Sequence, residues 1–230
     1  DGFSATTFDS TNSPVYVDID GLSMNNVADD GIYLYGVEAN IVDTDMTNVT
    51  EGITGSGGTW NIDSVTIDGA TNMAINNSLG NVTLNAVGIS NTTGTGMQVD
   101  GSTLSATGLS ISNSTGNGLE SINDSNITID NSTFSSNLRG ISIEGTETSM
   151  GTFNITNSAF TLNTESGLFI EYADGTVDGN TSSNNQYYGM ECNESTFATC
   201  NNNDLSSNVM GEQTGCDSTC GVEANPPVTE

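Results

Sequence analysis

The sequence contains almost no positive charge. Arg139 is the single basic residue, and there is no lysine and no histidine against 29 aspartates and glutamates, for a net charge of −28. Nucleic-acid binding needs cations that displace counterions from phosphates, so this class of partner is excluded. Attraction to anionic membranes is disfavoured for the same reason. Without histidine no Ser-His-Asp triad can form, and without lysine there is no G-x-x-x-x-G-K phosphate loop.

Long apolar runs are also missing. No stretch of 18 apolar residues occurs, which predicts no membrane insertion. No signal-peptide pattern is present, and we expect a mature or trimmed piece of a longer protein. Hydrophobic residues make up 33% of the chain, a low share that favours disorder unless an ordered repeat is present. The acidic field attracts cations and repels polyanions, and high salt screens it.

An ordered repeat is present. The stretch "ISNTTGTGM" (89–97) returns as "ISNSTGNGL" (111–119), 22 residues later. The same pattern aligns one small residue in each repeat, which we call the anchor. The anchors are Gly31, Gly52, Ala74, Gly96, Gly118, Gly140, Gly167, Gly189 and Gly211. The one long step contains "ETSMG" (147–151), which reads as an insertion. A large apolar residue follows almost every anchor, at Ile32, Ile53, Ile75, Met97, Leu119, Ile141, Leu168 and Met190, until Glu212 breaks the series.

Short alternating apolar runs precede each anchor, such as Val82/Leu84 and Val87/Ile89. Alternation with a period of two predicts strands with one buried face. A unit of 22 residues cannot close a core alone, but stacked units can, each about 4.8 Å from the next. We therefore expect a coil in which the residues after the anchors form one inward stack. Asparagines five positions before an anchor are expected to hold the turns and to form a hydrogen-bonded ladder; they are Asn26, Asn91, Asn113 and Asn184.

These features resemble the right-handed parallel β-helix (pectin-lyase-like) family. The resemblance covers residues 15–215 and implies an all-β, single-stranded coil of about nine rungs of about 22 residues, a rung being one full turn of the coil. A two-sheet sandwich is the alternative, but it does not explain the constant spacing. Residues 1–14, with Phe3 and Phe8, are expected to cap the first rung, and residues 216–230 to form a C-terminal cap and linker ending in "EANPPVTE".

The family that the resemblance implies contains polysaccharide lyases, glycoside hydrolases, epimerases and esterases, and also adhesins, phage spikes and structural coils, so the fold alone does not decide function. Lyase chemistry needs a cation beside the substrate carboxylate, and we expect Arg139 to pair with a nearby carboxylate instead. Asp29 and Asp30 in "ADDGI" look like the paired aspartates of polygalacturonase-like coils. The histidine and Arg-x-Lys motifs that accompany them in that family are absent, so a turn or a calcium ligand pair is the favoured interpretation.

Two further sets of residues are candidates for binding. Calcium prefers carboxylate and carbonyl oxygens, and the candidates are Asp18, Asp20, Asp29 and Asp30 in "DIDG" and "ADDG". Tyr33 and Tyr35 flank Leu34 and must point outward if Leu34 points inward. With Tyr187 and Tyr188 they are candidates for glycan binding, the alternative being ordinary exposed rings.

Four cysteines, Cys192, Cys200, Cys216 and Cys220, lie near the C-terminal end and indicate disulfides and an oxidising compartment. A zinc site is the alternative, although no histidine is available. Pairing between rungs (Cys192 with Cys216, Cys200 with Cys220) is favoured over local pairing because adjacent rungs supply the required Cα separation.

N-x-S/T sequons mark sites that an exporting host can glycosylate. They occur at Asn48, Asn76, Asn81, Asn91, Asn113, Asn123, Asn126, Asn131, Asn154, Asn180 and Asn193.

Together these features favour a secreted or cell-surface structural or adhesive module, as part of a longer surface protein or an extracellular assembly. A polysaccharide hydrolase or lyase, or a glycan-binding module without catalysis, is the alternative. Glycans or other surface proteins are the expected partners. The chain is expected to be monomeric at low salt, or to assemble end to end through residues 1–14 or 221–230 once salt or calcium reduces its self-repulsion.

Overall fold

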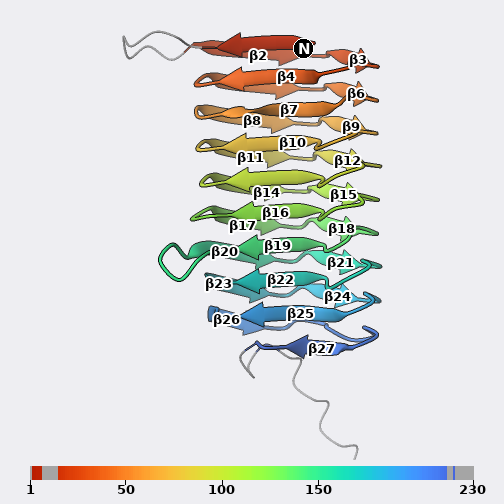
Figure 1. Cartoon of the computed structure of the whole chain (residues 1–230), viewed down its shortest axis with the longest axis vertical. Helices are drawn as coiled ribbons and strands as arrows, with labels where there is room; N and C mark the ends of the chain where they lie inside the picture. Colours follow the sequence, from red (N-terminus) through yellow and green to blue (C-terminus); the bar gives the residue numbers. More distant parts are fainter. Residues whose placement is uncertain (1, 7–14, 217–219, 221–230) are drawn as a thin grey trace, which may run out of the picture.

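The computed structural model describes residues 2–6, 15–216 and 220. These residues form a single elongated coil of parallel strands, stacked rung on rung along its long axis (Figure 1). The predicted all-β, parallel β-helix fold is confirmed. No helix long and apolar enough to cross a membrane occurs in the described ranges.

Successive rungs contribute strands to three parallel sheets of 10, 9 and 8 strands, and the rungs at the two ends are incomplete. Sheet A consists of β1 (Phe3–Thr6), β4 (Asp30–Tyr35), β7 (Glu51–Ser56), β10 (Ile75–Ser78), β13 (Met97–Asp100), β16 (Leu119–Ile122), β19 (Ile141–Glu144), β22 (Leu168–Glu171), β25 (Tyr188–Asn193) and β27 (Gly211–Thr214). Sheet B consists of β2 (Tyr16–Asp20), β5 (Glu38–Val42), β8 (Thr59–Asp63), β11 (Asn81–Asn85), β14 (Thr103–Thr107), β17 (Asn126–Asp130), β20 (Gly151–Thr156), β23 (Ala173–Asp178) and β26 (Thr196–Asn201). Sheet C consists of β3 (Ser23–Asn25), β6 (Asp45–Thr47), β9 (Thr66–Asp68), β12 (Gly88–Ser90), β15 (Ser110–Ser112), β18 (Thr133–Ser135), β21 (Ala159–Thr161) and β24 (Thr181–Ser183).

The expected inward stack is present on sheet A. Register pairs each residue of the stack with its counterpart on the next strand, and all of its members are fully buried: Ile32, Ile53, Ile75, Met97, Leu119, Ile141, Leu168 and Met190. Trp60 fills the interior from sheet B, and the rings of Phe134 and Phe160 stack at 5.3 Å from sheet C. The thin, continuous core explains how a chain with so few apolar residues folds.

The anchor glycines other than Gly211 are required by close packing rather than by an unusual backbone. A Cβ on Gly96 would lie 2.7 Å from the carbonyl oxygen of Gly118 on the next rung and 2.5 Å from Cγ2 of Ile111. The anchor and the apolar residue after it both face the interior at this corner. Only a residue with little or no side chain fits there, which accounts for the repeated glycine.

The asparagine ladder lies elsewhere than predicted. Asn26, Asn91, Asn113 and Asn184 hold turns with φ between 55° and 58°, but they are exposed. Of the bonds expected among them, the structure contains one, from Asn113 Nδ2 to Asn91 Oδ1 at a long 3.4 Å. The well-ordered ladder lies at the corner between sheets C and A and consists of the buried Asn137, Asn163 and Asn185 and the half-buried Asn208.

The two ends of the coil are built differently. Residues 3–6, part of the segment expected to cap the coil, form β1 and pair with β4 as the outermost strand of sheet A, where Phe3 aligns with Ile32 and packs against the core. At the other end, Gln213 rather than Glu212 aligns with Met190, because the last corner contains one extra residue and Gly211 pairs with Tyr188. The coil thus continues to Thr214. Phe8 and the proposed linker EANPPVTE (223–230) lie outside the described residues.

Candidate functional site

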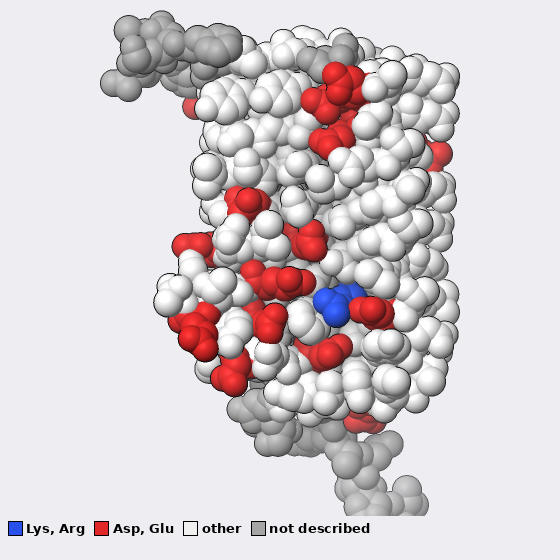
Figure 2. All heavy atoms as spheres, in the orientation of Figure 1, with Lys and Arg blue, Asp and Glu red and all other residues white. Residues whose placement is uncertain are grey.

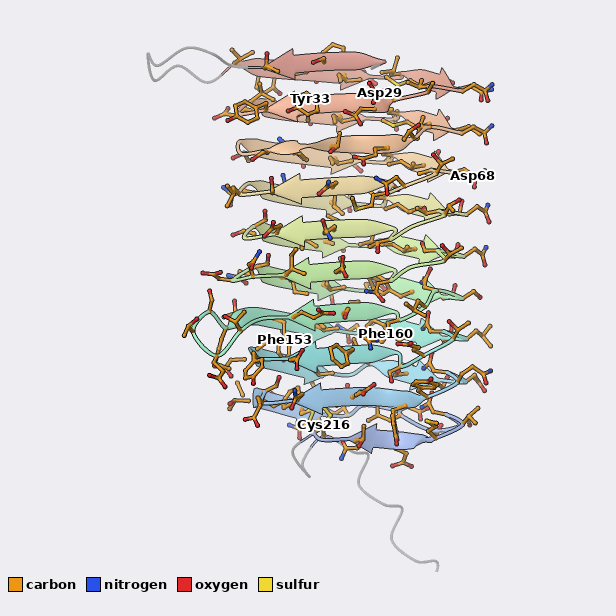
Figure 3. The ribbon with its side chains drawn as sticks, in the orientation of Figure 1. Asp29, Tyr33, Asp68, Phe153, Phe160 and Cys216 are labelled. Atoms are coloured by element: carbon orange, nitrogen blue, oxygen red, sulfur yellow. A yellow bond between two sulfur atoms is a disulfide. The ribbon has the colours of Figure 1, made fainter. Side chains whose placement is uncertain are left out.

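Of the binding candidates, Asp30, Tyr33, Tyr35 and Tyr188 lie on strands of sheet A, and Asp29 and Tyr187 directly precede such strands. Figure 2 shows carboxylates gathered on the outer face of this sheet in two groups, a small one at the N-terminal end of the coil and a larger one around Arg139. Side chains on this face project away from the coil, and Asp29 and Tyr33 both lie near its N-terminal end (Figure 3).

The N-terminal group is built around Asp30, which opens β4 directly opposite Glu51 on β7. Partial burial raises the pKa of Asp30 above its ordinary value, and the charges of Glu51 and Asp29 raise it further. Glu51 accepts a short hydrogen bond from the amide of Asn72. A carboxyl group with a raised pKa opposite a second carboxyl group is a candidate general acid.

Two tyrosine rings adjoin this carboxylate group. Ile32 and Leu34 are fully buried, so Tyr33 and Tyr35 project outward from the same strand as Asp30, as predicted. Tyr33 is half-buried and Tyr35 is 47% exposed. The structure thus places on one strand candidates that the sequence analysis treated as two separate sets, because Asp30 opens the strand that carries Tyr33 and Tyr35.

The second tyrosine pair lies far from the first. Tyr188 opens β25 and Tyr187 precedes it, 40% exposed. Seven strand spacings separate β4 from β25 in sheet A, which corresponds to about 34 Å. The four rings therefore do not line one groove, and any ligand that contacts both pairs must be a long polymer.

Arg139 is held by its neighbours in the middle of the larger acidic group. Its Nε donates to Glu165 Oε2 at 2.8 Å, and its Nη1 lies 3.8 Å from Glu144 Oε1. The guanidinium sits 4.0 Å above the ring of Phe169, and Nη1 also donates to Ser142 at 3.3 Å. The structure contains the ion pair expected from the sequence, and it leaves this cation little freedom to neutralise a substrate carboxylate.

The insertion at 147–151 creates a hollow that the sequence analysis did not anticipate. Glu147, Met150, Tyr172 and Glu194 line it. Burial raises the pKa of the Tyr172 phenol, and the charges of Glu147, Glu194 and Glu171 add to the effect. The only sequence signal was the single step longer than 22 residues, which located the insertion but not the residues around it.

The expected calcium ligands do not converge. Asp18 and Asp20 project from β2 of sheet B, whereas Asp29 and Asp30 precede or open β4 of sheet A. Sheet C separates the two pairs along the chain, and Asp18 accepts a hydrogen bond from Asn40 at 2.8 Å. No group of three or more potential metal-ligating side chains occurs in the described part of the chain. A calcium site that combines the two motifs is therefore not formed.

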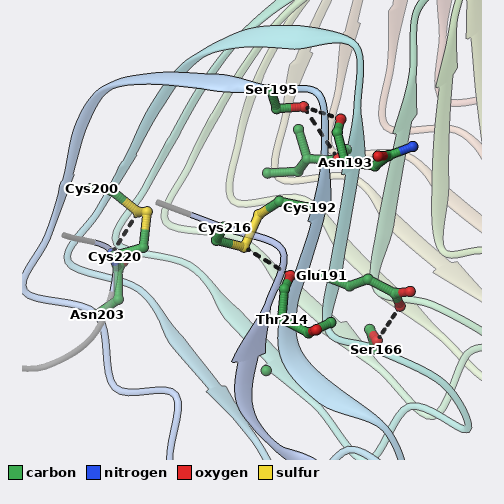
Figure 4. Close-up of a disulfide and its surroundings, with 12 residues drawn as sticks. Ser166, Glu191, Cys192, Asn193, Ser195, Cys200, Asn203, Thr214, Cys216 and Cys220 are labelled. Carbon is green, nitrogen blue, oxygen red and sulfur yellow. Dashed lines mark hydrogen bonds between the residues drawn. A yellow bond between two sulfur atoms is a disulfide. The ribbon is translucent and has the colours of Figure 1, made fainter. Parts of the chain in front are cut away.

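The cysteines form the inter-rung pairs that the spacing favoured. Cys192 bonds to Cys216 and Cys200 bonds to Cys220, with Cα–Cα separations of 4.8 and 4.6 Å (Figure 4). Cys192 and Cys200 are inward-facing residues of β25 and β26, and Cys220 is fully buried. The two disulfides thus lie across the interior of the last rungs, and no cysteine is left to ligate zinc.

The sequons divide by position. Asn180 is only 1% exposed, and its side chain is bonded to the backbone of Ser158 and Ile155 and to Asn203. The expectation that Asn180 is glycosylated is therefore wrong for the folded protein, because its side chain is inaccessible. The consensus sequence carries no information about burial. Asn76 is half-buried, and the other sequon asparagines are exposed.

Comparison with known proteins identifies the fold. The family model described as "Right handed beta helix region" matches residues 95–226. No curated protein matches the sequence. Among solved structures, the Dettilon tailspike protein (gp208) is similar with a TM-score of 0.51 at 12% identity, over 87% of this chain and 60% of the tailspike chain. This chain therefore spans less than two thirds of the tailspike's length.

Two enzymes show weaker similarity. Pectate lyase Pel9A has a TM-score of 0.43 at 14% identity, over 89% of this chain and 68% of its own. The periplasmic alginate epimerase AlgG has a TM-score of 0.38 at 12% identity, over 96% of this chain and 77% of its own.

Proposed function

The chain belongs to the right-handed β-helix family, and from that premise we propose that it is an extracellular or cell-surface structural and adhesive module. It would act as a stiff spacer that presents its flat outer faces to glycans or to other surface proteins. We propose that it forms part of a longer surface protein or of an extracellular assembly.

The observation that carries this proposal is the state of Arg139. The whole sequence offers this one basic side chain, and Glu165, Glu144 and Phe169 already hold it. Lyase or epimerase chemistry on a uronate needs a positive group at the substrate carboxylate, and a field of −28 opposes the approach of an anionic polymer. The likeness to a tailspike protein is compatible with a structural role, and the two disulfides favour an oxidising exterior.

Binding without turnover is the test of the proposal. The purified chain, immobilised on beads, is offered polysaccharides and glycan-coated surfaces, and retained material is measured together with newly formed reducing or unsaturated ends. We expect retention of at least one surface with no new chain ends. Absence of retention on every surface would contradict an adhesive role.

Glycoside hydrolysis is the second candidate, and the raised pKa of Asp30 favours it. Asp30 would act as the acid and Glu51 or Asp29 would supply the second carboxyl group, near Tyr33 and Tyr35 of the same strand. This candidate predicts new reducing ends from a glycan, lost in Asp30→Asn and retained in Asp20→Asn, an exposed aspartate on sheet B. Turnover with that dependence would replace the structural proposal.

The oligomeric state is a separate part of the proposal. We expect monomers at low salt, because copies of charge −28 repel one another, and association when salt or millimolar calcium screens that charge. Light scattering across a salt and calcium series measures this. Large assemblies at low salt without divalent ions would instead favour a fibre subunit.

A further inference from the structure

The outer face of sheet B carries a strip without a single charged side chain. We call it the sheet B track and define it as the first two outward positions of β8, β11, β14, β17 and β20. Its residues are Thr59, Asn61, Asn81, Thr83, Thr103, Ser105, Asn126, Thr128, Thr152 and Asn154. All of them are threonine, asparagine or serine, in a chain with 29 carboxylates.

The side chains of the track retain their hydrogen-bonding capacity. Within the described ranges only Asn61 makes a side-chain hydrogen bond, by donating to Asn40 Oδ1 at 2.8 Å. The neighbouring outward row of the same sheet behaves differently: Asp63 accepts from Asn85 at 2.9 Å, and Asp130 accepts from Thr156 at 2.7 Å. The polar groups of the track are therefore available to a ligand, whereas those beside it bind one another.

Register makes the track periodic along the coil. Thr59, Asn81, Thr103, Asn126 and Thr152 align on adjacent strands, as do their counterparts two positions later. Adjacent strands are about 4.8 Å apart, so the track offers a hydroxyl or amide at that interval over about 19 Å. A linear polymer with regularly spaced hydroxyls, lying along the coil axis, matches such a row.

A hollow lies at the N-terminal end of the track. Tyr16, Glu38, Ala39, Asn40, Thr59 and Asn61 line it. The Tyr16 side chain is 64% exposed, the largest exposed fraction among the aromatic residues with exposed side chains, and it aligns with Glu38 on the next strand. An exposed ring beside a carboxylate, amides and a hydroxyl supplies both a flat apolar surface and orienting polar groups.

We propose that the sheet B track binds a neutral, extended polysaccharide that lies along the coil axis, with a sugar ring stacked on Tyr16. The proposal rests on the adhesive function above and names its partner class and its face. Charge selects a neutral polymer, because the track has no cation to bind an anionic one and the flanking Asp63, Asp130 and Glu38 repel it. A protein partner is disfavoured because the track has no aromatic or large apolar anchor.

The test uses the full chain produced without N-glycosylation. Binding is measured by co-sedimentation with cellulose and chitin and by affinity electrophoresis in gels that contain mixed-linkage β-glucan or, for comparison, pectate. We expect binding to at least one neutral polymer and none to pectate. Thr103→Asp places an unpaired carboxylate in the centre of the track, and we expect it to weaken binding at least about tenfold. Tyr16→Ala should weaken binding, whereas Tyr16→Phe, which keeps the aromatic ring, should bind as the parent does.

The matched control is Ser110→Asp, which adds the same charge on the exposed face of sheet C. It should fold and bind as the parent does, and circular dichroism with thermal melts identifies any variant that fails to fold. Equal binding by Thr103→Asp and Ser110→Asp would overturn the track while leaving an adhesive function elsewhere intact. Failure to bind any of the neutral polymers would overturn it as well.

Two other outcomes would also refute the track as a polysaccharide site. N-glycans found by mass spectrometry on Asn81, Asn126 or Asn154 of the natural protein would cover it. The second outcome is that the parent protein shows thermal hysteresis of freezing, loses it in Thr103→Asp and binds no polysaccharide. That result would indicate that the periodic face binds ordered water instead.

Discussion

Replacing Asn163 by alanine removes one member of the buried amide ladder. Its Oδ1 accepts the backbone N–H of Asn137 at 3.0 Å, and its Nδ2 donates to the Phe134 carbonyl at 3.3 Å and to Asn185 Oδ1 at 2.9 Å. Asn163 is fully buried, so water does not replace these bonds. The change leaves polar groups of two neighbouring rungs without their partner.

A buried donor or acceptor left without a partner costs about 1–3 kcal/mol. With the Asn137 N–H and the Phe134 carbonyl affected, we expect Asn163→Ala to lower the free energy of unfolding by about 2–4 kcal/mol. For a chain of this size that corresponds to a fall in Tm of about 4–16 °C. Because a solenoid unfolds as stacked units, hydrogen exchange at the Asn137 amide reports the local loss more directly than the melt does.

The matched control is Asn184→Gly on the neighbouring rung. Asn184 is exposed with φ 58°, a conformation that glycine adopts without strain, and its side chain donates only to Ser183 at 3.3 Å. We expect its stability to stay within about 0.5 kcal/mol of the parent. If Asn163→Ala and Asn184→Gly had equal melts and equal exchange at Asn137, the buried ladder would not stabilise the coil and the reasoning would be refuted.

Three further changes test other parts of the structure. Asn77 is fully buried with both amide atoms unpartnered, so Asn77→Leu should raise the free energy of unfolding in denaturant titrations by about 1–3 kcal/mol; a loss would contradict this. Cys192→Ser combined with Cys216→Ser should cost about 3 kcal/mol, seen as faster hydrogen exchange in β25 and β27 and not in β4. The folded-state pKa of Asp30 is raised, so its stabilising contribution is present below pH 3.8 and lost as pH rises through the folded pKa. Asp30→Asn should therefore melt higher than the parent at pH 7 and equally at pH 3, whereas equal melts at both values would refute the raised pKa.

The sequence by itself determined the coil. An apolar residue that recurs every 22 positions after a small one has only one efficient way to be buried, which is to stack on its own copies, as Ile75, Met97 and Leu119 do. The same period placed Cys192 and Cys216 one rung apart and so favoured their pairing. Alternation within β4 was enough to direct Tyr33 outward. Each of these inferences depends on spacing along the chain, which a regular solenoid converts directly into spacing in space.

Only the tertiary structure decided which side chains are neighbours on adjacent rungs and which residues lie on different sheets. Asn113 directly follows β15 and has φ 57°, whereas Asn137 is the second residue after β18, and sequence alone did not show that this second position points into the coil. It could not separate the aspartates of β2 from Asp29 and Asp30, since "DIDG" and "ADDG" are close in the chain but lie on different sheets. Nor could it show that Glu165 and Phe169 hold Arg139, or that the neutral side chains of sheet B form one continuous strip. These properties arise from residues about 22 or more positions apart whose side chains meet only when the rungs stack.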